Sequence, residues 1–420
     1  MNPVHEKIAA SRFWSNTTSR RLVPLGAASA ISTGGDYCFA VAMPWLALSR
    51  HGGPTLLALV MASYGLPRTL LIPAGGFLAD RWGSMKVMLA ADVVRCLAAG
   101  CLVFASTRTE VRASSLAILA AVLGGGEGLF MPASFSLLPK LLPEEQLQAG
   151  NAAMTVATQL GTVVGPSVGG ALVASFGVAS AFGADAASFA LSGLVLVRLI
   201  STRPGSLGSA RRGGAPSEAS SAASVWSFLR HSRLFKVVLG MSIAGNFALG
   251  GLVDIGLPGF AHRHLGAVGY GVILTGLGTG IIAGALLVAR IGTLARPALV
   301  SLAVFALEGV GIAYLPFSPG LTGPVCTGLL VGACSGFADI LILTLIQQLA
   351  PRHLLGRLMS IMMLGSYGLY PVSVLFFGAV LRAWGPVPCF PLAAAIIAVA
   401  LLVGLGSREF RRLGSGAAAG

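Results

Sequence analysis

Charged side chains are scarce in this sequence of 420 residues, of which only 10% are Asp, Glu, Lys or Arg. Soluble domains carry about 25% of these residues. Hydrophobic residues make up 55% of the chain, and the mean hydropathy over its whole length is +0.84. This composition excludes a soluble globular protein. It requires many membrane spans, each of about 20 apolar residues.

Motifs for phosphate, metal and redox chemistry are missing as well. The sequence has no Gly-x-x-x-x-Gly-Lys-Ser/Thr loop, which would bind a nucleotide phosphate. Its six histidines lie outside the apolar runs, and its six cysteines lie inside them without metal-ligand or redox spacing. We interpret the cysteines as small core residues. We therefore expect no cofactor, no metal site and no enzymatic activity.

The apolar runs predict an all-α integral membrane protein with twelve transmembrane helices. They cover residues 22–48, 55–79, 86–106, 113–141, 148–174, 178–199, 234–261, 268–290, 297–316, 320–350, 357–382 and 386–407. A polar stretch rich in Ser, Gly, Ala and Pro follows the sixth run, and such a composition cannot form a core. The predicted parts are a cytoplasmic N-terminal segment (1–21), a six-helix bundle (22–199), a cytoplasmic linker (200–233), a second six-helix bundle (234–407) and a cytoplasmic tail (408–420).

The distribution of Lys and Arg predicts the orientation of the chain. With the N-terminus inside, 21 of the 28 basic residues lie in inside segments, five lie in outside loops, and Arg68 and Arg95 lie within spans. Cytoplasmic loops of membrane proteins carry an excess of Lys and Arg. We therefore expect a multi-pass protein of the cell membrane with both termini in the cytoplasm. The net charge of +14 then needs no nucleic-acid partner to explain it.

The two halves share a weak internal repeat. Residues 75–83, after the second run, are similar to residues 284–292, after the eighth, at an offset of 209. Leu142-Pro143 and Ala350-Pro351 recur at an offset of 208. Parallel repeats of six spans are a transporter architecture in which the substrate site lies near the midplane between the halves.

A motif at the end of the second span points to a family. It reads Gly76-Phe77-Leu78-Ala79-Asp80-Arg81-Trp82-Gly83, with Lys86 beyond it. It resembles the signature that the major facilitator superfamily carries between helices 2 and 3, which is Gly, two or three residues, Asp-Arg, one residue, Gly and then basic residues. The sequence departs from the signature after its second glycine, where Ser84 and Met85 stand.

Further matches are similar to the branch that holds macrolide-efflux proteins and the enterobactin exporter. They are Gly35-Asp36, Leu66-Pro67, Ala91-Asp92 with Arg95, Met131-Pro132-Ala133, Gly165-Pro166 with Gly169-Gly170, and Gly356-Arg357. The Arg-containing motif of many drug antiporters is absent from the fourth span, where residues 124–128 read Gly-Gly-Gly-Glu-Gly.

The resemblance implies a secondary exporter that moves a small hydrophobic or cationic molecule, such as a drug, antibiotic or secondary metabolite, in exchange for protons. Its expected partners are that substrate, protons and the lipid bilayer, and the protein is expected to be a monomer. A siderophore exporter or a lysophospholipid flippase of the same fold stays an alternative. A membrane enzyme or assembly factor without a transport cycle is a remote one.

Seven acidic residues fall within predicted spans, where a charged residue costs about 2.5–3.5 kcal/mol on insertion scales. They are Asp36, Asp92, Glu127, Asp185, Asp254, Glu308 and Asp339. The resemblance implies that helices 1, 4, 7 and 10 line a central cavity. The substrate-cavity residues are therefore expected to be Asp36, Phe39, Glu127, Phe130, Asp254 and Asp339. For each acid a structural hydrogen bond is the alternative, and for the aromatic residues it is ordinary packing.

Three charged residues are expected at one depth near the bilayer centre, namely Asp36, Arg68 and Glu127. They lie about 11–14 residues from the inner ends of their spans, or about 16–21 Å at 1.5 Å per residue. One arginine neutralises one carboxylate, and the other carboxylate then favours its protonated form in a medium of low dielectric constant. The hypothesis is that Glu127 carries the proton and that Asp36 pairs with Arg68. The reverse assignment stays open.

Two further sets of residues are expected to serve conformational change. The resemblance implies that Asp80 caps the inner end of helix 11 near Gly356-Arg357, within a gating set of Gly76, Asp80, Arg81, Gly83, Lys86, Asp92 and Arg95. In the fifth span, small residues spaced by four predict a flat packing face, and a proline can bend the helix. This helix-5 set is Gly161, Gly165, Pro166, Gly169 and Gly170, and packing and hinge roles both stay open.

Overall fold

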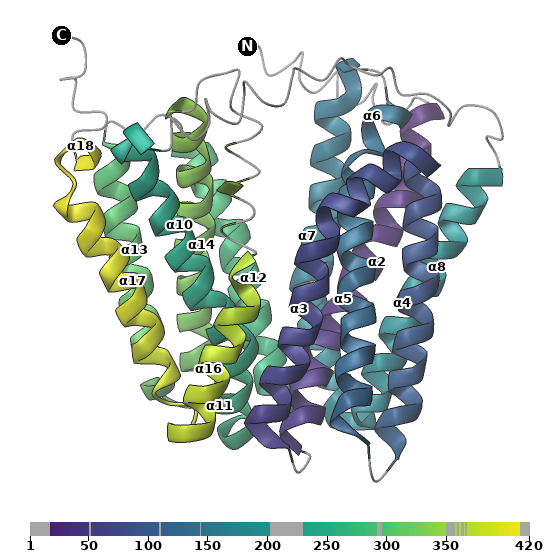
Figure 1. Ribbon diagram of the computed structural model, residues 1–420, viewed down its shortest axis with the longest axis horizontal. Helices are drawn as coiled ribbons and strands as arrows, with labels where there is room; N and C mark the ends of the chain where they lie inside the picture. Colours follow the sequence, from purple (N-terminus) through teal and green to yellow (C-terminus); the bar gives the residue numbers. More distant parts are fainter. Residues whose placement is uncertain are drawn as a thin grey trace. The chain divides into compact units, whose positions relative to one another are not determined.

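The structure is a computed structural model. It describes residues 17–49, 52–108, 111–142, 144–201, 230–291, 296–349 and 368–411, together with residues 358, 361, 362 and 365. Every regular element within these residues is a helix (Figure 1), which confirms the all-α prediction. The elements are α2 (Thr17–Ser49), α3 (Gly53–Leu78), η1 (Ala79–Gly83), α4 (Ser84–Thr107), α5 (Ala113–Phe135), α6 (Leu138–Leu141), α7 (Glu144–Phe176), α8 (Val178–Ser201), α10 (Arg233–Gly251), η2 (Leu252–Gly256), α11 (Leu257–His264), α12 (Gly266–Ile291), α13 (Pro297–Tyr314), η3 (Leu315–Phe317), α14 (Thr322–Leu349), α16 (Tyr370–Trp384), α17 (Cys389–Gly406) and α18 (Arg408–Arg411).

The helices are long enough for a membrane protein. Among the described residues, nine helical stretches are long and apolar enough to cross a bilayer, and α16 is a shorter apolar helix. The longest stretch, Gly53–Thr107, contains the second and third predicted spans without a loop between them. The π-helical turn η1 joins the two helices, and the chain turns at Gly83, where φ is 93°. That conformation needs a residue without Cβ, which explains the second glycine of the signature.

Two predicted spans are divided in the structure. The fourth was expected to reach residue 141, but α5 ends at Phe135 and the short helix α6 follows. The seventh is interrupted by the π-helical turn η2, where the Leu257 N–H bonds to the Leu252 carbonyl. Pro258 has no N–H to offer the carbonyl four residues earlier, that of Asp254. The π turn therefore places Asp254 where the regular helical ladder is broken.

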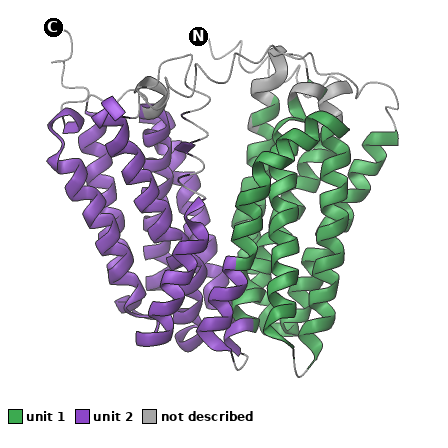
Figure 2. Cartoon of the chain, in the orientation of Figure 1, with its two compact units in different colours: residues 1–46, 63–210 green, residues 47–62, 211–420 purple. Residues whose placement is uncertain are grey.

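The chain forms two compact units (Figure 2). Unit 1 comprises residues 1–46 and 63–210, and unit 2 comprises residues 47–62 and 211–420. Residues 47–62, at the end of α2 and the start of α3, thus belong with the second unit, where Ala58 lies against Gly378 of α16. The predicted linker stays a prediction, because residues 202–229 lie outside the described part of the chain.

The sequence repeat corresponds to a repeated helix contact. A methyl group at Gly75 of α3 would approach the carbonyl oxygens of Leu129 and Gly128 on α5 to 2.8 and 2.9 Å. A methyl group at Gly284, the matching residue of α12, would overlap the Ala333 carbonyl of α14. The same glycine therefore allows the second helix of each half to pack closely on the fourth.

Candidate functional site

Closely packed glycines of α5 build the polar site of unit 1. A methyl group at Gly124 would overlap the carbonyl of Tyr64, and one at Gly128 would overlap the carbonyl of Arg68. Both partners lie on α3, so the two helix backbones are in direct contact on either side of Glu127. The Gly-rich stretch that replaces the Arg-containing helix-4 motif thus brings the Glu127 carboxylate onto α3.

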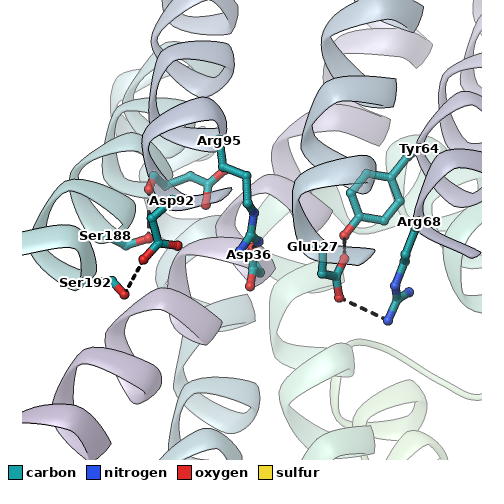
Figure 3. A network of polar contacts seen from close by, with 9 residues as sticks. Asp36, Tyr64, Arg68, Asp92, Arg95, Glu127, Ser188 and Ser192 are labelled. Atoms are coloured by element: carbon teal, nitrogen blue, oxygen red, sulfur yellow. Dashed lines mark hydrogen bonds and ion pairs between the residues drawn. The ribbon is translucent and has the colours of Figure 1, made fainter. Parts of the chain in front are cut away.

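Glu127 is held by two side chains of α3 (Figure 3). The Tyr64 hydroxyl donates a short hydrogen bond to Glu127 Oε2, and Arg68 Nη2 lies 3.0 Å from Glu127 Oε1. Phe39 of α2 stacks on the Tyr64 ring with the ring centroids 5.5 Å apart. The Glu127 side chain is 21% exposed, so the helices do not enclose it completely.

Arg95 of α4 forms the second ion pair of the site, with Asp36 of α2 (Figure 3). Gly126 makes room for it, since a methyl group there would lie 2.5 Å from Arg95 Cγ. The Arg95 guanidinium stands over the Phe189 ring at 4.0 Å from its centroid, which is cation–π geometry. The Arg95 side chain is 3% exposed, whereas the Asp36 side chain is 32% exposed.

Two more carboxylates lie deep in the same unit. Asp92 is 0% exposed and accepts a hydrogen bond of 2.6 Å from the Ser192 hydroxyl of α8, and its Oδ1 has no hydrogen-bond partner. Asp185 of α8 is 1% exposed, and its Oδ1 also lacks a partner. A methyl group at Gly35 would lie 3.0 Å from that oxygen. Asp185 therefore lies beside the backbone that carries Asp36.

The polar site of unit 1 contains more acids than bases. Its two arginines each pair with one carboxylate, Arg68 with Glu127 and Arg95 with Asp36. Asp92 and Asp185 have no ion pair among the described residues. Burial of an ionised carboxylate without a cation is very costly. At least one proton is therefore expected within the site.

The structure shows a charge pair that differs from the leading hypothesis and agrees with its reverse, and it shows where two residues of the gating set lie. Arg68 pairs with Glu127 and not with Asp36, because the glycines on either side of Glu127 place it directly on α3. Asp92 and Arg95 were assigned to the gate beside Arg81 and Lys86. They are instead buried inside unit 1 with partners on α8 and α2, whereas Arg81 and Lys86 are exposed.

Asp185 is the site residue that sequence reasoning set aside, because nothing local marks it. Its position follows from the contact of α8 with Gly35, which no pattern along one helix reveals. Phe130, predicted for the cavity, lies beside the same network, with its ring centroid 5.8 Å from Arg95 Cζ.

Unit 2 holds its acids with hydroxyl groups. The Tyr370 hydroxyl donates a hydrogen bond of 2.5 Å to Asp254 Oδ2 on the π turn η2. The Ser335 hydroxyl donates to the buried Glu308. Asp339, the other predicted cavity acid of this unit, is exposed on α14. π turns are frequent at functional sites, which makes Asp254 the candidate functional residue of unit 2.

The remaining members of the gating set lie at the junction of α3 and α4. Asp80, Arg81 and Gly83 form part of η1, and Gly76 lies one turn earlier on α3. Ser84, which stands where the signature prefers a basic residue, is buried and hydrogen-bonds Ser136 at 2.7 Å. A long charged side chain would not fit there. The expected partner of Asp80, near residues 356–357, lies outside the described residues.

The helix-5 glycines lie against α2. Methyl groups at Gly161, Gly165 and Gly169 of α7 would approach the backbone of residues 30–38; the contact distances at Gly165 and Gly169 are 2.7 Å to the Gly34 carbonyl and 2.9 Å to Cys38 Cα. Pro166 and Gly170 are buried in the same helix, and α7 continues to Phe176. The flat face therefore packs against another helix, and a hinge role stays a prediction.

No group of three or more His, Cys, Asp or Glu side chains that would hold a metal ion occurs in the part of the chain that the structure describes.

Some known proteins are similar to this chain in sequence, and others are similar to it in fold. It is 27% identical over 370 residues to the multidrug efflux pump Tap of Mycolicibacterium fortuitum, a match that covers 82% of this chain and 85% of Tap. It is 31% identical over 176 residues to the MFS-type transporter YfiS of Bacillus subtilis (strain 168), of which it covers 41%. A crystal structure of the peptide transporter POT in complex with sulfate has the same fold, with a TM-score of 0.73 at 16% identity, covering 96% of this chain and 97% of POT.

The sequence model of the Major Facilitator Superfamily matches residues 25–372, which confirms the resemblance first seen at the junction of the second and third spans. Together with these relatives and this fold, that match over most of the sequence shows that the chain is a multi-pass membrane transporter and belongs to the Major Facilitator Superfamily.

Proposed function

We propose that this protein exports a small hydrophobic or cationic molecule in exchange for protons, by alternating access with both termini in the cytoplasm. The observation that carries the proposal is the excess of carboxylates over arginines in the buried polar site of unit 1. The name of Tap, a multidrug efflux pump, supports the direction of transport and the class of cargo.

The proton is proposed to bind at Asp36 and Asp185, because Arg95 pairs with Asp36 and Asp185 lies beside the backbone of Gly35. The single charge of Arg95 balances one of these carboxylates, and two close carboxylates in a low dielectric medium then share one proton. Asp36 is the member that reaches water, with a side-chain exposure of 32%. Asp36 would therefore exchange the proton, while Arg95 stays neutralised by Asp185.

Glu127 is the second candidate for the proton carrier, and sequence reasoning placed the proton there. The geometry favours Asp36, because Glu127 has both the Arg68 guanidinium and the Tyr64 hydroxyl as its own partners. A carboxylate with a cation and a donor is stable in its ionised form. Glu127 would thus keep α3 and α5 together during the cycle.

Exchange follows from the charge balance of the site. With one proton, Asp36, Asp185 and Arg95 together are neutral, and loss of the proton leaves one negative charge. A cationic substrate restores neutrality, so that proton and substrate compete for the same carboxylate. The stacked rings of Phe39 and Tyr64 lie next to the polar site, and aromatic faces attract organic cations.

The test compares two acids of unit 1 with one of unit 2 in proteoliposomes. An imposed pH gradient drives uptake of the lipophilic cation tetraphenylphosphonium, and an entrapped dye reports proton flux. Asp36→Asn is expected to abolish proton-coupled transport, whereas Glu127→Gln keeps coupling with altered apparent affinity. Glu308→Gln, which changes a buried acid of unit 2, is the matched control and should behave like the wild type.

Two results would contradict the proposal in different ways. Loss of coupling in Glu127→Gln with coupling retained in Asp36→Asn would return the proton to Glu127. Wild-type pH dependence in both variants would refute proton exchange in unit 1 altogether. Failure of the wild-type protein to move this cation, together with proton-coupled movement of a neutral hydrophobic compound, would refute the cationic substrate.

A further inference from the structure

An apolar groove with a basic end lies on the surface of unit 1, apart from the polar site. Its volume is about 850 Å³, within the range of about 300–1,000 Å³ that is usual for ligand pockets. Residues of α3, η1, α4 and α5 form its walls, among them Leu71, Val94, Ile118 and Gly125. Ile118 and Val94 are 63% and 45% exposed, so the groove opens at the surface and not into the helix contacts.

The groove lies on the side of α5 that faces away from Glu127. Gly125 lines it, and positions two residues apart in an α-helix point about 200° apart. Its lining contains no acid, and its only charged members are Arg81 and Lys86. The two ion pairs within the described residues use Arg68 and Arg95, so the charges of Arg81 and Lys86 are available at the groove.

The dimensions of the groove match one leaflet of a bilayer. On α5 it extends from Leu129 to Ile118, eleven residues or about 16 Å along the helix axis. The hydrocarbon core of a bilayer is about 30 Å thick, so one leaflet is about 15 Å deep. Arg81, Lys86 and Trp82 lie together at one end. Tryptophan favours the membrane interface, and basic pockets between helices bind the headgroups of anionic lipids.

We propose that this groove binds one anionic glycerophospholipid of the leaflet at the level of η1. Arg81 and Lys86 hold the phosphate, Trp82 lies at the level of the headgroup, and the acyl chains follow α4 and α5 toward the bilayer centre. Because Gly126 lies between the groove and the Arg95 side chain, the lipid would lie directly behind the site that carries the Asp36–Arg95 pair.

The test uses Trp82 as a reporter of lipid composition. Trp14, Trp45, Trp226 and Trp384 are replaced by Phe, and the protein is placed in phosphatidylcholine vesicles with a small fraction of acyl-brominated phosphatidylglycerol or acyl-brominated phosphatidylcholine. Brominated chains quench nearby tryptophan fluorescence. We expect quenching of Trp82 to show that the groove binds brominated phosphatidylglycerol at least about fivefold more strongly than brominated phosphatidylcholine. One basic residue near a membrane surface provides a preference of about this size.

Matched variants make the result specific to the groove. A protein that keeps only Trp384, 71% exposed at the end of α16 in unit 2, should show no preference between the two lipids. Arg81→Gln with Lys86→Gln should remove the preference at Trp82. Ala90→Phe, which fills the groove and keeps both charges, should reduce quenching by bound phosphatidylglycerol. Circular dichroism of each variant excludes misfolding as the cause.

Several outcomes would overturn the proposal. Equal quenching of Trp82 by both lipids would show an unselective surface, and a preference that survives the double Gln variant would place the anion elsewhere. If quenching by both lipids falls as the protein density in the vesicles rises, a second copy of the chain covers the groove in place of a lipid. None of these readouts depends on transport, so failure here leaves the proposed export function untouched.

Discussion

Each unit holds a carboxylate with a tyrosine, but the units differ in what balances the charge. Glu127 in unit 1 accepts from Tyr64 and pairs with Arg68, whereas Asp254 in unit 2 accepts from Tyr370. Both ion pairs formed by the described residues belong to unit 1. A carboxyl group held by a hydroxyl keeps its hydrogen bond when it is protonated. When a carboxylate paired with arginine is protonated, the arginine is left as a buried cation without a partner, and this is far more costly.

This difference assigns different tasks to the two units. Binding of one proton in unit 1 changes the balance of a buried charge network, and side chains must then rearrange. In unit 2, the buried Glu308 accepts a hydrogen bond from the Ser335 hydroxyl, and protonation of Glu308 does not require the loss of that contact. We therefore expect proton coupling in unit 1, and substrate selection or structural support in unit 2. The predictions below compare substitutions at matched residues of the two units, and they thereby test this division.

Arg95→Gln should give the largest effect. It leaves Asp36 and Asp185 together without a cation, and removal of one partner of a buried ion pair costs about 3–5 kcal/mol. Glu308→Gln in unit 2 removes an acid of similar burial but leaves no charge behind, so the loss of stability in this variant should be much smaller. Thermal unfolding of both variants in detergent compares them, and Arg95→Gln with Asp36→Asn should recover part of the loss. Equal destabilisation by the two single variants would contradict the division between the units.

Gly128→Ala and Gly332→Ala should both destabilise the protein, by about 1–3 kcal/mol. The new methyl group would overlap the Arg68 carbonyl in unit 1 or the Leu277 carbonyl in unit 2. Only Gly128→Ala moves Arg68 relative to Glu127, so only that variant should alter the apparent affinity in the way expected of Glu127→Gln. Gly100→Ala, with no atom within 4 Å of its new methyl group, is the control. A pH profile altered by Gly332→Ala would show that proton coupling extends into unit 2.

The helices could be predicted from the sequence because an apolar run and its polar ends are local signals. Close contacts between helices could be predicted in part. Gly75 and Gly284 occupy matching positions of the sequence repeat, and each lies where its helix packs closely on another helix. The division of the seventh span could have been suspected from Pro258, which removes a helical donor. The register change to a π turn, however, depends on packing that Pro258 alone does not reveal.

Charge pairing was harder to predict, because it depends on which helices meet. Asp92 and Arg95 are three residues apart on one helix, and positions at that spacing share a helix face. That their face points into the bundle depends on Gly126 and on α8, and the sequence showed neither contact. Asp185 was set aside for the same reason, since only the contact at Gly35 places it beside Asp36.

The tyrosines form the closest matched pair between the units, and their removal should have intermediate effects. A hydrogen bond to a charged group contributes about 1.5–3 kcal/mol, so changes of about tenfold or more are expected. Tyr64→Phe removes a donor to Glu127, so it should weaken the contact of α3 with α5 and lower the midpoint of thermal unfolding. The pH of half-maximal transport, which Asp36 is proposed to set, should stay unchanged. Tyr370→Phe should change the apparent affinity for the cation and also leave that pH unchanged. Measurement of unfolding, affinity and pH dependence in both variants checks this, and a shifted transport pH in Tyr64→Phe would assign the proton to Glu127.

Asp80→Asn should give the smallest of these effects, and it compares the two copies of the repeat. Asp80 is exposed on the turn η1 of unit 1, and Ala289 is exposed at the matching place on α12 of unit 2. By family resemblance Asp80 caps a helix end, and a carboxylate near the positive end of a helix dipole gains about 0.3–1 kcal/mol. Its neutralisation should therefore slow transport by up to about fivefold. Ala289→Asn introduces the same amide in unit 2 but removes no charge, and its initial rate should equal that of the wild type at matched protein levels. Similar slowing by both variants would show that the two halves gate alike, and the asymmetry between the units would then be confined to the buried network around Asp36 and Glu127.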